Sequence, residues 1–135
     1  MKQRTLGLVK PNATAAELQD FILNDVNNSG YGLKVVKSQM LTLTEEQAKE
    51  FYAEHAEKSF FGELVEFMTS GPIVAFVVEG DNAVQDYRTL LGNTDPAKAE
   101  AWTIRGKYAS KKEENSAHGS DSVEAAEREV NFFFG

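Results

Sequence analysis

Apolar and polar positions alternate along the chain in a way that divides it into short strand-like and helix-like segments. Three apolar runs are typical of strands: residues 4–10 (RTLGLVK), 33–43 (LKVVKSQMLTL) and 73–78 (IVAFVV). The last run consists of apolar residues only, which indicates a strand buried on both faces. Pro11 follows the first run and favours an end to the strand at that point.

The segments between these runs carry apolar residues at the spacing of a helix. Residues 13–27 are predicted to form one helix, which Gly30 or Gly32 would cap at its C-terminal end. Thr44 and Gln47 have the spacing of a capping box, which marks the start of a further helix. Helices are therefore expected over residues 13–27, 44–54, 60–69 and 80–91, and from Asp121 onward.

The C-terminal part of the chain combines an irregular segment with a helix. Residues 92–115 show no periodicity beyond a possible turn at 96–101, and a long irregular segment in a compact domain is usually functional or disordered. A short strand is expected next. The final helix is expected to bury a stripe of apolar residues: Val123, Ala126, Val130 and Phe133.

The order of these elements predicts an α/β (α+β) sandwich. Strands with helical crossovers between them are typical of the split βαβ, ferredoxin-like arrangement, a βαββαβ chain whose four-stranded antiparallel sheet is covered by helices. No repeat, linker or low-complexity tract interrupts the sequence, and 135 residues is a common size for one domain. We therefore expect residues 1–135 to form a single domain.

Composition and charge narrow the class of protein. The chain has no apolar run near the ~20 residues of a membrane helix, and its first apolar stretch is too short for a signal peptide. It contains no cysteine, which excludes a disulfide framework and thiol chemistry. A cytoplasmic protein without a membrane partner is expected. The net charge of −7 argues against nucleic acid as a partner, because such binding depends on Lys and Arg side chains that neutralise phosphates.

Several familiar kinds of site are not expected from the sequence. Neither GxxxxGK[ST] nor GxGxxG occurs. The two histidines, His55 and His118, lie far apart with no second ligand at metal spacing, so a zinc site is not expected. Ser120 and Asp121 lie close to His118, but a hydrolase triad needs side chains that converge from separate elements.

His118 is the most distinctive candidate for chemistry. It lies in NSAHGSD (115–121), just before a predicted helix start, where unpaired N–H groups favour anions. A neutral imidazole offers a nucleophilic lone pair and can form a covalent intermediate. Glu129, at the edge of the apolar stripe, could accept a hydrogen bond from one ring nitrogen and stabilise positive charge on the ring. From spacing alone, a structural histidine and a solvated glutamate are open alternatives.

Motifs along nearly the whole chain resemble those of the nucleoside diphosphate kinase family. They are TLGLVKP, FYAEH, SFFGELVEFMTSGPIVAFVVEG, YRTLLGNTDP, TIRG, HGSDS and SVEAAEREVNFFF, in the family's order. The resemblance implies a ferredoxin-like fold and a two-step reaction. A nucleoside triphosphate phosphorylates a histidine, the diphosphate leaves, and a second diphosphate takes the phosphate. It further implies Mg²⁺ held mainly by the nucleotide phosphates rather than by protein ligands, and a homo-oligomer, a hexamer or tetramer built from dimers.

The resemblance assigns roles at the reaction centre. His118 would be the phosphorylated nucleophile, and Glu129, with help from Ser120, would orient it. Tyr52 would line the site near Lys10 and the histidine.

The resemblance also assigns residues to the nucleotide. Phe60 would stack on the base, which suits broad base use because every base has a π face. Asn115 would contact the ribose, and Gly119 would leave room for the backbone beside the nucleophile. The phosphates would be bound by Lys10, which also reaches the sugar, and by Arg88, Thr94 and Arg105.

The sequence departs from the family's pattern at some positions. Asn12 stands where aspartate is usual, Ser59 where proline is usual, Trp102 where glycine is usual, and Lys107 where an acid is usual. None of these is a proposed catalytic residue. Two other classes of function stay open: a regulatory module that binds nucleotide without turnover, and a ferredoxin-like interaction domain without nucleotide chemistry.

Overall fold

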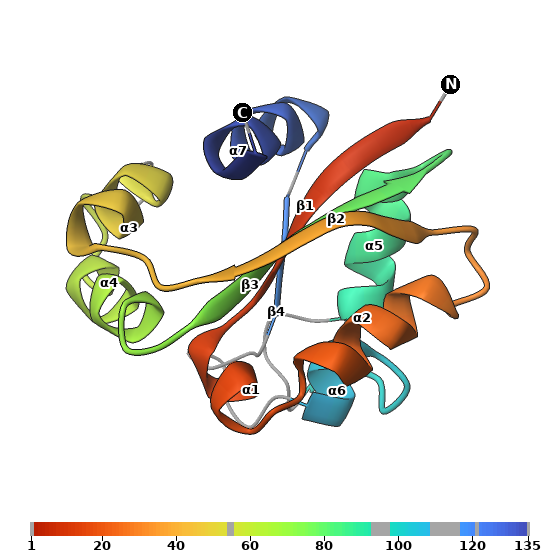
Figure 1. Cartoon of the computed structure of the whole chain (residues 1–135), viewed down its shortest axis with the longest axis horizontal. Coiled ribbons are helices and arrows are strands. Elements are labelled where there is room, and N and C mark those ends of the chain that lie inside the picture. Colours follow the sequence, from red (N-terminus) through yellow and green to blue (C-terminus); the bar gives the residue numbers. More distant parts are fainter. Residues whose placement is uncertain (1, 54–55, 93–97, 109–116, 121, 135) are drawn as a thin grey trace.

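A four-stranded antiparallel sheet is the centre of the computed structural model, which describes residues 2–53, 56–92, 98–108, 117–120 and 122–134. Its strands follow the order β2-β3-β1-β4 (Figure 1). They are β1 (Gln3–Val9), β2 (Lys34–Leu41), β3 (Ile73–Gly80) and β4 (Ala117–Gly119). This arrangement confirms the predicted ferredoxin-like sandwich.

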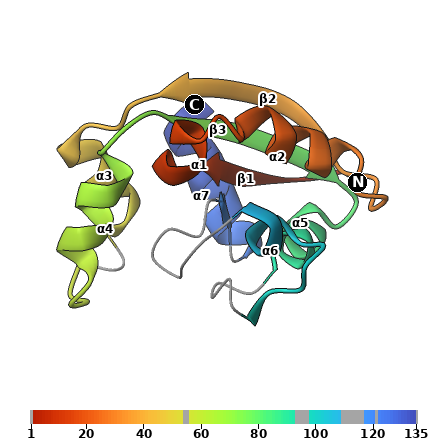
Figure 2. The same cartoon turned by 90° about the horizontal axis from the view of Figure 1, so that it is seen from below.

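Helices cover both faces of the sheet. They are α1 (Pro11–Ala15), α2 (Gln19–Asn27), α3 (Glu45–Phe51), α4 (Phe61–Met68), α5 (Ala83–Leu91), α6 (Ile104–Tyr108) and α7 (Val123–Phe134). The core on one face takes side chains from α1, α2, α5 and α6, and the core on the other takes them from α3, α4 and α7. Figures 1 and 2 show the α3–α4 pair at the end where β2 leaves the sheet and β3 enters it. None of the helices in the described part of the chain has the length and apolarity needed to cross a bilayer.

The register of β1 with its neighbours decides which side chains face the site. β1 pairs with β3 along its whole length, and its second half pairs with β4, with Leu8 opposite His118. Opposed residues on neighbouring strands share a face. His118 therefore lies on the face of Leu6 and Leu8, while Gly7 and its partner Gly119 belong to the opposite face.

The first predicted helix, residues 13–27, is wrong as a single element. The chain forms α1 and α2 instead, and between them Glu17 has a φ of 59°, in the left-handed region that a helix cannot continue through. Asn28 is the C-cap of α2, and Gly30 and Gly32 lie beyond it with positive φ. The two glycines therefore serve the turn that leads to β2, not the helix cap.

The capping box at the start of α3 is confirmed. Gln47 N donates to Thr44 Oγ1 at 3.1 Å, and Thr44 N donates to Gln47 Oε1 at 2.9 Å. α3 ends at Phe51, with Tyr52 as its C-cap, and the expected end, Glu54, lies outside the described residues. α6 was not predicted, since a helix of 5 residues is too short to show an apolar period.

The start of α7 is capped by a serine. Ser122 Oγ accepts a hydrogen bond from Ala125 N at 3.1 Å, which is the contact of an N-cap side chain. Asp121, the helix start expected from the sequence, lies outside the described residues.

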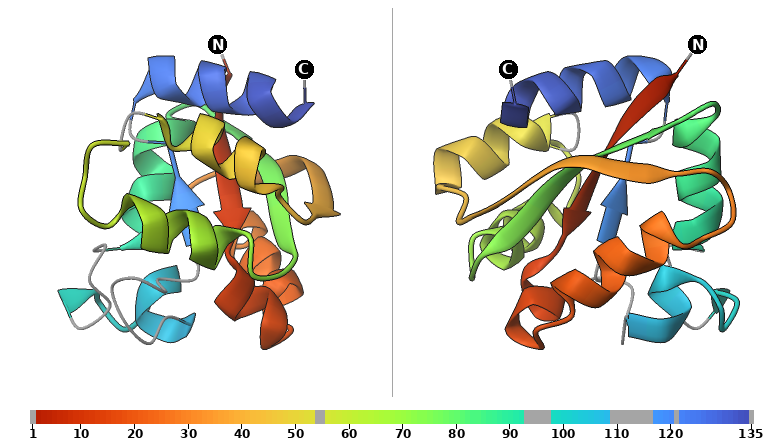
Figure 3. Two further views of the ribbon diagram at one scale, coloured as in Figure 1. Left: turned by 90° about the vertical axis from the view of Figure 1, so that its left-hand side faces the viewer. Right: turned by 45° about the vertical axis from the view of Figure 1, so that its right-hand side comes forward.

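The buried stripe of α7 was predicted only in part. Ala126 is buried, and Val130 and Phe133 are half-buried against the core. The prediction that Val123 is buried was wrong. Val123 is 43% exposed, because the buried side of the helix is centred on Ala126 and Glu129. A glutamate thus takes a buried place on the apolar side of the helix. Figure 3 shows α7 lying across the sheet beside β1.

Candidate active site

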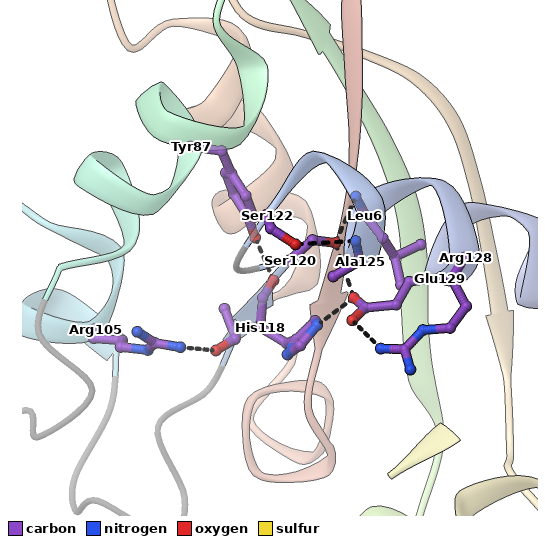
Figure 4. A network of polar contacts seen from close by, with 10 residues as sticks. Leu6, Tyr87, Arg105, His118, Ser120, Ser122, Ala125, Arg128 and Glu129 are labelled. Atoms are coloured by element: carbon purple, nitrogen blue, oxygen red, sulfur yellow. Dashed lines mark hydrogen bonds and ion pairs between the residues drawn. The ribbon is translucent and has the colours of Figure 1, made fainter. Parts of the chain in front are cut away.

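His118 and Glu129 form a hydrogen-bonded pair at the edge of the sheet. His118 is the middle residue of β4, and Glu129 lies on α7, which packs against β1. His118 Nε2 is 2.8 Å from Glu129 Oε1 (Figure 4). An ionised carboxylate accepts hydrogen bonds and cannot donate one, so Nε2 carries the hydrogen and Nδ1 keeps its lone pair. The pair therefore offers one defined nitrogen to a reactant.

Ser120 and Arg128 hold the other sides of the glutamate. Ser120 is buried, and its Oγ donates to Glu129 Oε1 at 2.8 Å and accepts from Leu6 N at 3.4 Å. Arg128 Nη2 lies 3.6 Å from Glu129 Oε2. These contacts fix the carboxylate (Figure 4), so the imidazole bonded to it is fixed as well.

The protonation states of the pair follow from their surroundings. Burial alone would raise the pKa of Glu129, but the hydrogen bonds from His118 and Ser120, with the Arg128 charge, outweigh it and hold that pKa below its usual value. Burial lowers the pKa of His118, and the charges of Lys10 and Arg105 lower it further, against the opposing pull of Glu129. The imidazole is therefore neutral at neutral pH, as a nucleophile must be.

Cations are crowded beside this histidine. Lys10 follows β1 and is only 8% exposed, and burial together with the Arg105 charge lowers its pKa to about 7. Arg105 is in turn close enough to Arg88 for the two guanidinium charges to repel. Like charges held together at a partly buried site are stabilised by an anion, and phosphate is an anion whose oxygens match a guanidinium fork.

Backbone contacts anchor Arg105 in this cluster. Its Nη1 donates to Gly92 O at 3.1 Å, and its Nη2 donates to Ala117 O at 3.0 Å. Its Nε is buried without a hydrogen-bond partner among the described residues. The guanidinium therefore bridges the end of α5 and the start of β4, next to the candidate nucleophile.

Tyr52 is linked to the histidine through the ring of Phe51. Its ring is buried and meets Phe51 edge-on with centroids 4.8 Å apart, and Phe51 meets the His118 ring edge-on at 5.7 Å. Burial raises the pKa of the Tyr52 phenol, and the Glu129 charge raises it further. The phenol therefore stays protonated and able to donate.

Phe60 stands at the surface. It is 45% exposed at the N-terminal end of α4, and Lys58 Nζ lies 5.8 Å from the centre of its ring. An aromatic ring that is exposed to this extent can stack on a planar partner. Its neighbour Ser59 is also exposed.

The structure thus brings most of the predicted site residues together. Direct contacts join His118, Ser120 and Glu129, and electrostatic interactions join them to Tyr52, Lys10, Arg105 and, through Arg105, Arg88. Two of the predicted site residues, Thr94 and Asn115, lie outside the described residues, as does the second histidine, His55.

The packing of α5 against β4 requires glycine at position 119. A Cβ there would lie 2.6 Å from Leu91 Cδ1 and 2.9 Å from Tyr87 Cε2, both on α5. The residue lets α5 approach β4 closely, and the space it leaves is filled by α5. The expected role of leaving room beside the nucleophile is not what its surroundings show.

Three residues of the site were missed. Phe51 contacts the imidazole, Arg128 contacts Glu129, and the Tyr87 hydroxyl donates to His118 O at 3.0 Å. The two aromatic residues fit apolar stripes and give no sign of a role in sequence. Arg128 could have been suspected from its place next to Glu129.

A hollow of about 500 Å³ adjoins the site from the side of α7. It is lined by Glu50, Phe51, Arg128, Glu129, Asn131 and Phe132. Lys10, Arg88 and Arg105 do not line this hollow, so it is not the space beside the cations that are expected to bind phosphate. Among the residues that the structure describes, no three His, Asp or Glu side chains gather as metal ligands.

Comparison with known proteins identifies the arrangement. The model of the family described as nucleoside diphosphate kinase matches residues 3–135. A nucleoside diphosphate kinase of Haemophilus ducreyi (strain 35000HP / ATCC 700724) is 50% identical over 134 residues, which is 99% of this chain and 96% of that protein.

Solved structures agree. The orthorhombic C222 crystal form of the Aquifex aeolicus nucleoside diphosphate kinase is 39% identical, with a TM-score of 0.95 over 100% of this chain and 96% of that one. The cubic, apo form of the Encephalitozoon cuniculi enzyme is 35% identical, with a TM-score of 0.93 over 98% and 89% of the two chains. The chain therefore belongs to the nucleoside diphosphate kinase family, phosphotransferases that pass the γ-phosphate of a nucleoside triphosphate to a nucleoside diphosphate through a phosphohistidine.

Proposed function

We propose that Nδ1 of His118 is the atom that carries the phosphate in this reaction. In the first half-reaction Nδ1 attacks the γ-phosphorus, the N–P bond forms, the bond from phosphorus to the bridging oxygen breaks, and the diphosphate leaves. A terminal oxygen of the second diphosphate then attacks the phosphorus and releases the imidazole. The observation that carries the proposal is the 2.8 Å contact of His118 Nε2 with Glu129 Oε1, which leaves the lone pair on Nδ1.

Glu129 and Ser120 orient the nucleophile. The imidazole gains positive charge as Nδ1 bonds to phosphorus, and the carboxylate on Nε2 stabilises that charge. The Ser120 hydroxyl keeps Oε1 in place. Tyr52, protonated and next to the glutamate charge, lines the same site.

Lys10, Arg88 and Arg105 bind the phosphates. Their mutual repulsion, and the low pKa of Lys10, are the properties of a cation group built to receive an anion. Phe60 stacks on the base through its exposed ring. For Thr94 on the phosphates and Asn115 on the ribose, the support is the family resemblance alone.

Mg²⁺ is the cofactor that fits this site. The cluster beside His118 is made of cations, so the ion would be held by the phosphate oxygens and their waters, with no protein residue assigned to it. When bound, it neutralises charge on the transferring phosphoryl group. The chain would act as one catalytic domain in the cytoplasm, without nucleic acid as a partner.

A homo-oligomer, a hexamer or tetramer built from dimers, is proposed for the assembly. β2 is an edge strand with mostly exposed residues, and such an edge can pair with a second copy. Phe21 is 60% exposed and Met40 is 56% exposed, so α2 and β2 offer apolar surface to a partner.

One labelling experiment tests the proposed role of His118. The protein is incubated with γ-labelled ATP and Mg²⁺, and label stable in base and labile in acid is measured on the chain. We expect label on the wild type and on His55→Ala, the control at the other histidine, and none on His118→Ala. An unlabelled wild type, folded and saturated with nucleotide, would support the regulatory module instead. Label retained by His118→Ala would refute the assignment of the nucleophile.

A further inference from the structure

Tyr87 makes a contact with the reaction centre that the family roles above do not include. It lies on α5 and is completely buried. Its hydroxyl donates to the backbone carbonyl oxygen of His118 at 3.0 Å (Figure 4). Burial raises the pKa of this phenol well above its usual value, so it stays protonated and able to donate at neutral pH.

Two glycines make room for this tyrosine. Gly7 of β1 and Gly119 of β4 lie opposite each other in the sheet. A Cβ on Gly7 would lie 2.7 Å from the Tyr87 hydroxyl, and a Cβ on Gly119 would lie 2.9 Å from its ring. The Phe76 ring meets Tyr87 edge-on at 5.8 Å and closes a further side. The phenol is thus held in a slot of fixed shape, and its hydroxyl has little freedom to leave the carbonyl.

The strand that carries His118 needs such support. Among the described residues, β4 spans 3 residues and lies at the edge of the sheet, where β1 is its neighbouring strand. On the carbonyls of this strand, Tyr87 holds His118 O and Arg105 holds Ala117 O. Glu129 holds the far end of the imidazole, at Nε2. A ring fixed both at its backbone and at Nε2 has a fixed direction for Nδ1.

We propose that Tyr87 is a positioning residue, which fixes the His118 backbone so that Nδ1 points along the line of phosphoryl transfer. The residue after it on α5 is Arg88, one of the cations assigned to the phosphates. One helix therefore sets both the place of the nucleophile and the place of a phosphate ligand. Transfer in line depends on that relative position, because small misplacement of reacting atoms lowers the rate steeply.

The test compares two variants of the protein, each of which lacks the hydroxyl of one tyrosine. Tyr87→Phe keeps the ring in the slot and removes the bond to His118 O. Tyr108→Phe is the matched control, because the Tyr108 hydroxyl donates to Asp25 Oδ2 at 2.8 Å, a contact outside the reaction centre. Both variants are assayed by rapid quench at 15 °C, where circular dichroism verifies that they are folded.

We expect Tyr87→Phe to lower the first-order rate of His118 phosphorylation about 5- to 20-fold with an unchanged KM for nucleotide. Tyr108→Phe is expected to react at the wild-type rate even if both variants lose similar thermal stability. A Tyr87→Phe rate within twofold of wild type, or an equal loss in Tyr108→Phe, would overturn the proposal.

A second readout does not depend on turnover. The chain has only 2 histidines, so ¹⁵N-histidine NMR can follow the Nε2–H of His118 directly. We expect this proton to exchange with water at least about 5-fold faster in Tyr87→Phe than in the wild type or Tyr108→Phe, because the loss of the hydroxyl removes one of the contacts that hold the His118 backbone. Unchanged exchange would overturn the positioning role. The proposal rests on His118 as the phosphate carrier. If ATP leaves no label on the wild type but the Nε2–H exchanges faster in Tyr87→Phe, the assignment of His118 as the phosphate carrier is refuted and the contact that positions it is not.

Discussion

Glu129→Gln tests how much the charge on the buried carboxylate contributes to phosphoryl transfer. Glutamine has the shape of glutamate and can still accept from His118 Nε2 through its amide oxygen. The substitution therefore removes the charge and keeps the hydrogen bond. The site is suited to this separation because Glu129 is only 5% exposed and its Oε1 also receives the Ser120 hydroxyl, which helps to keep the new amide in place.

The expected loss follows from the strength of the bond at 2.8 Å. A hydrogen bond to a charged group contributes about 1.5–3 kcal/mol and a neutral one about 0.5–1.5 kcal/mol. The imidazole becomes positive only as Nδ1 bonds to phosphorus, so the difference, about 1–2 kcal/mol, belongs to the transition state and the phosphohistidine. It corresponds to a rate roughly 5- to 30-fold lower.

Rapid-quench measurement of protein labelling with saturating γ-labelled ATP gives this rate directly. Glu127→Gln is the matched control, because it removes an exposed glutamate from the same helix. We expect the control to match the wild type. The reasoning is refuted if Glu129→Gln labels within twofold of the wild-type rate, or if Glu127→Gln slows by the same factor.

Further predictions concern the cations, the base and a helix end. Because the pKa of Lys10 is about 7 in the free protein, its charge is present below pH 7 and lost above it, so ATP affinity should fall from pH 7 to 9. Calorimetry should show this fall in the wild type, and a parallel fall in Lys10→Met would contradict the role of the Lys10 charge. Phe60→Ala should raise KM for purine and pyrimidine diphosphates alike, roughly 5-fold or more, and steady-state assays that show loss for one base only would exclude stacking. Thr44→Ala should lower the free energy of unfolding in urea by about 1 kcal/mol through loss of the bond from Gln47 N, and an unchanged midpoint would contradict the cap.

Local signals predicted much of the fold. The capping box at Thr44 and the apolar run of β3 depend on neighbours in sequence, and both elements begin where expected. The break between α1 and α2 was missed, because it falls at Glu17, where neither glycine nor proline marks a turn. The short α6 was missed because one turn of helix carries no period.

The site was predictable through its charged and polar residues and not through its packing. His118 and Glu129 stand out because an imidazole among small residues and an acid at an apolar stripe are unusual. Tyr87 does not stand out, since a tyrosine on the buried side of a helix is typical of a core. Its role depends on a contact between α5 and β4, which only the folded chain brings together.

The position of the phosphate on the histidine ring shows which nitrogen of His118 is the nucleophile. The wild-type protein is labelled with ¹⁵N-histidine, phosphorylated with ATP and Mg²⁺, and examined by ³¹P and ¹⁵N NMR in mild base. The hydrogen bond of Nε2 to Glu129 predicts phosphorus on Nδ1 of His118. Phosphorus on Nε2, or on any residue other than His118, would contradict the assignment of Nδ1 as the phosphate carrier.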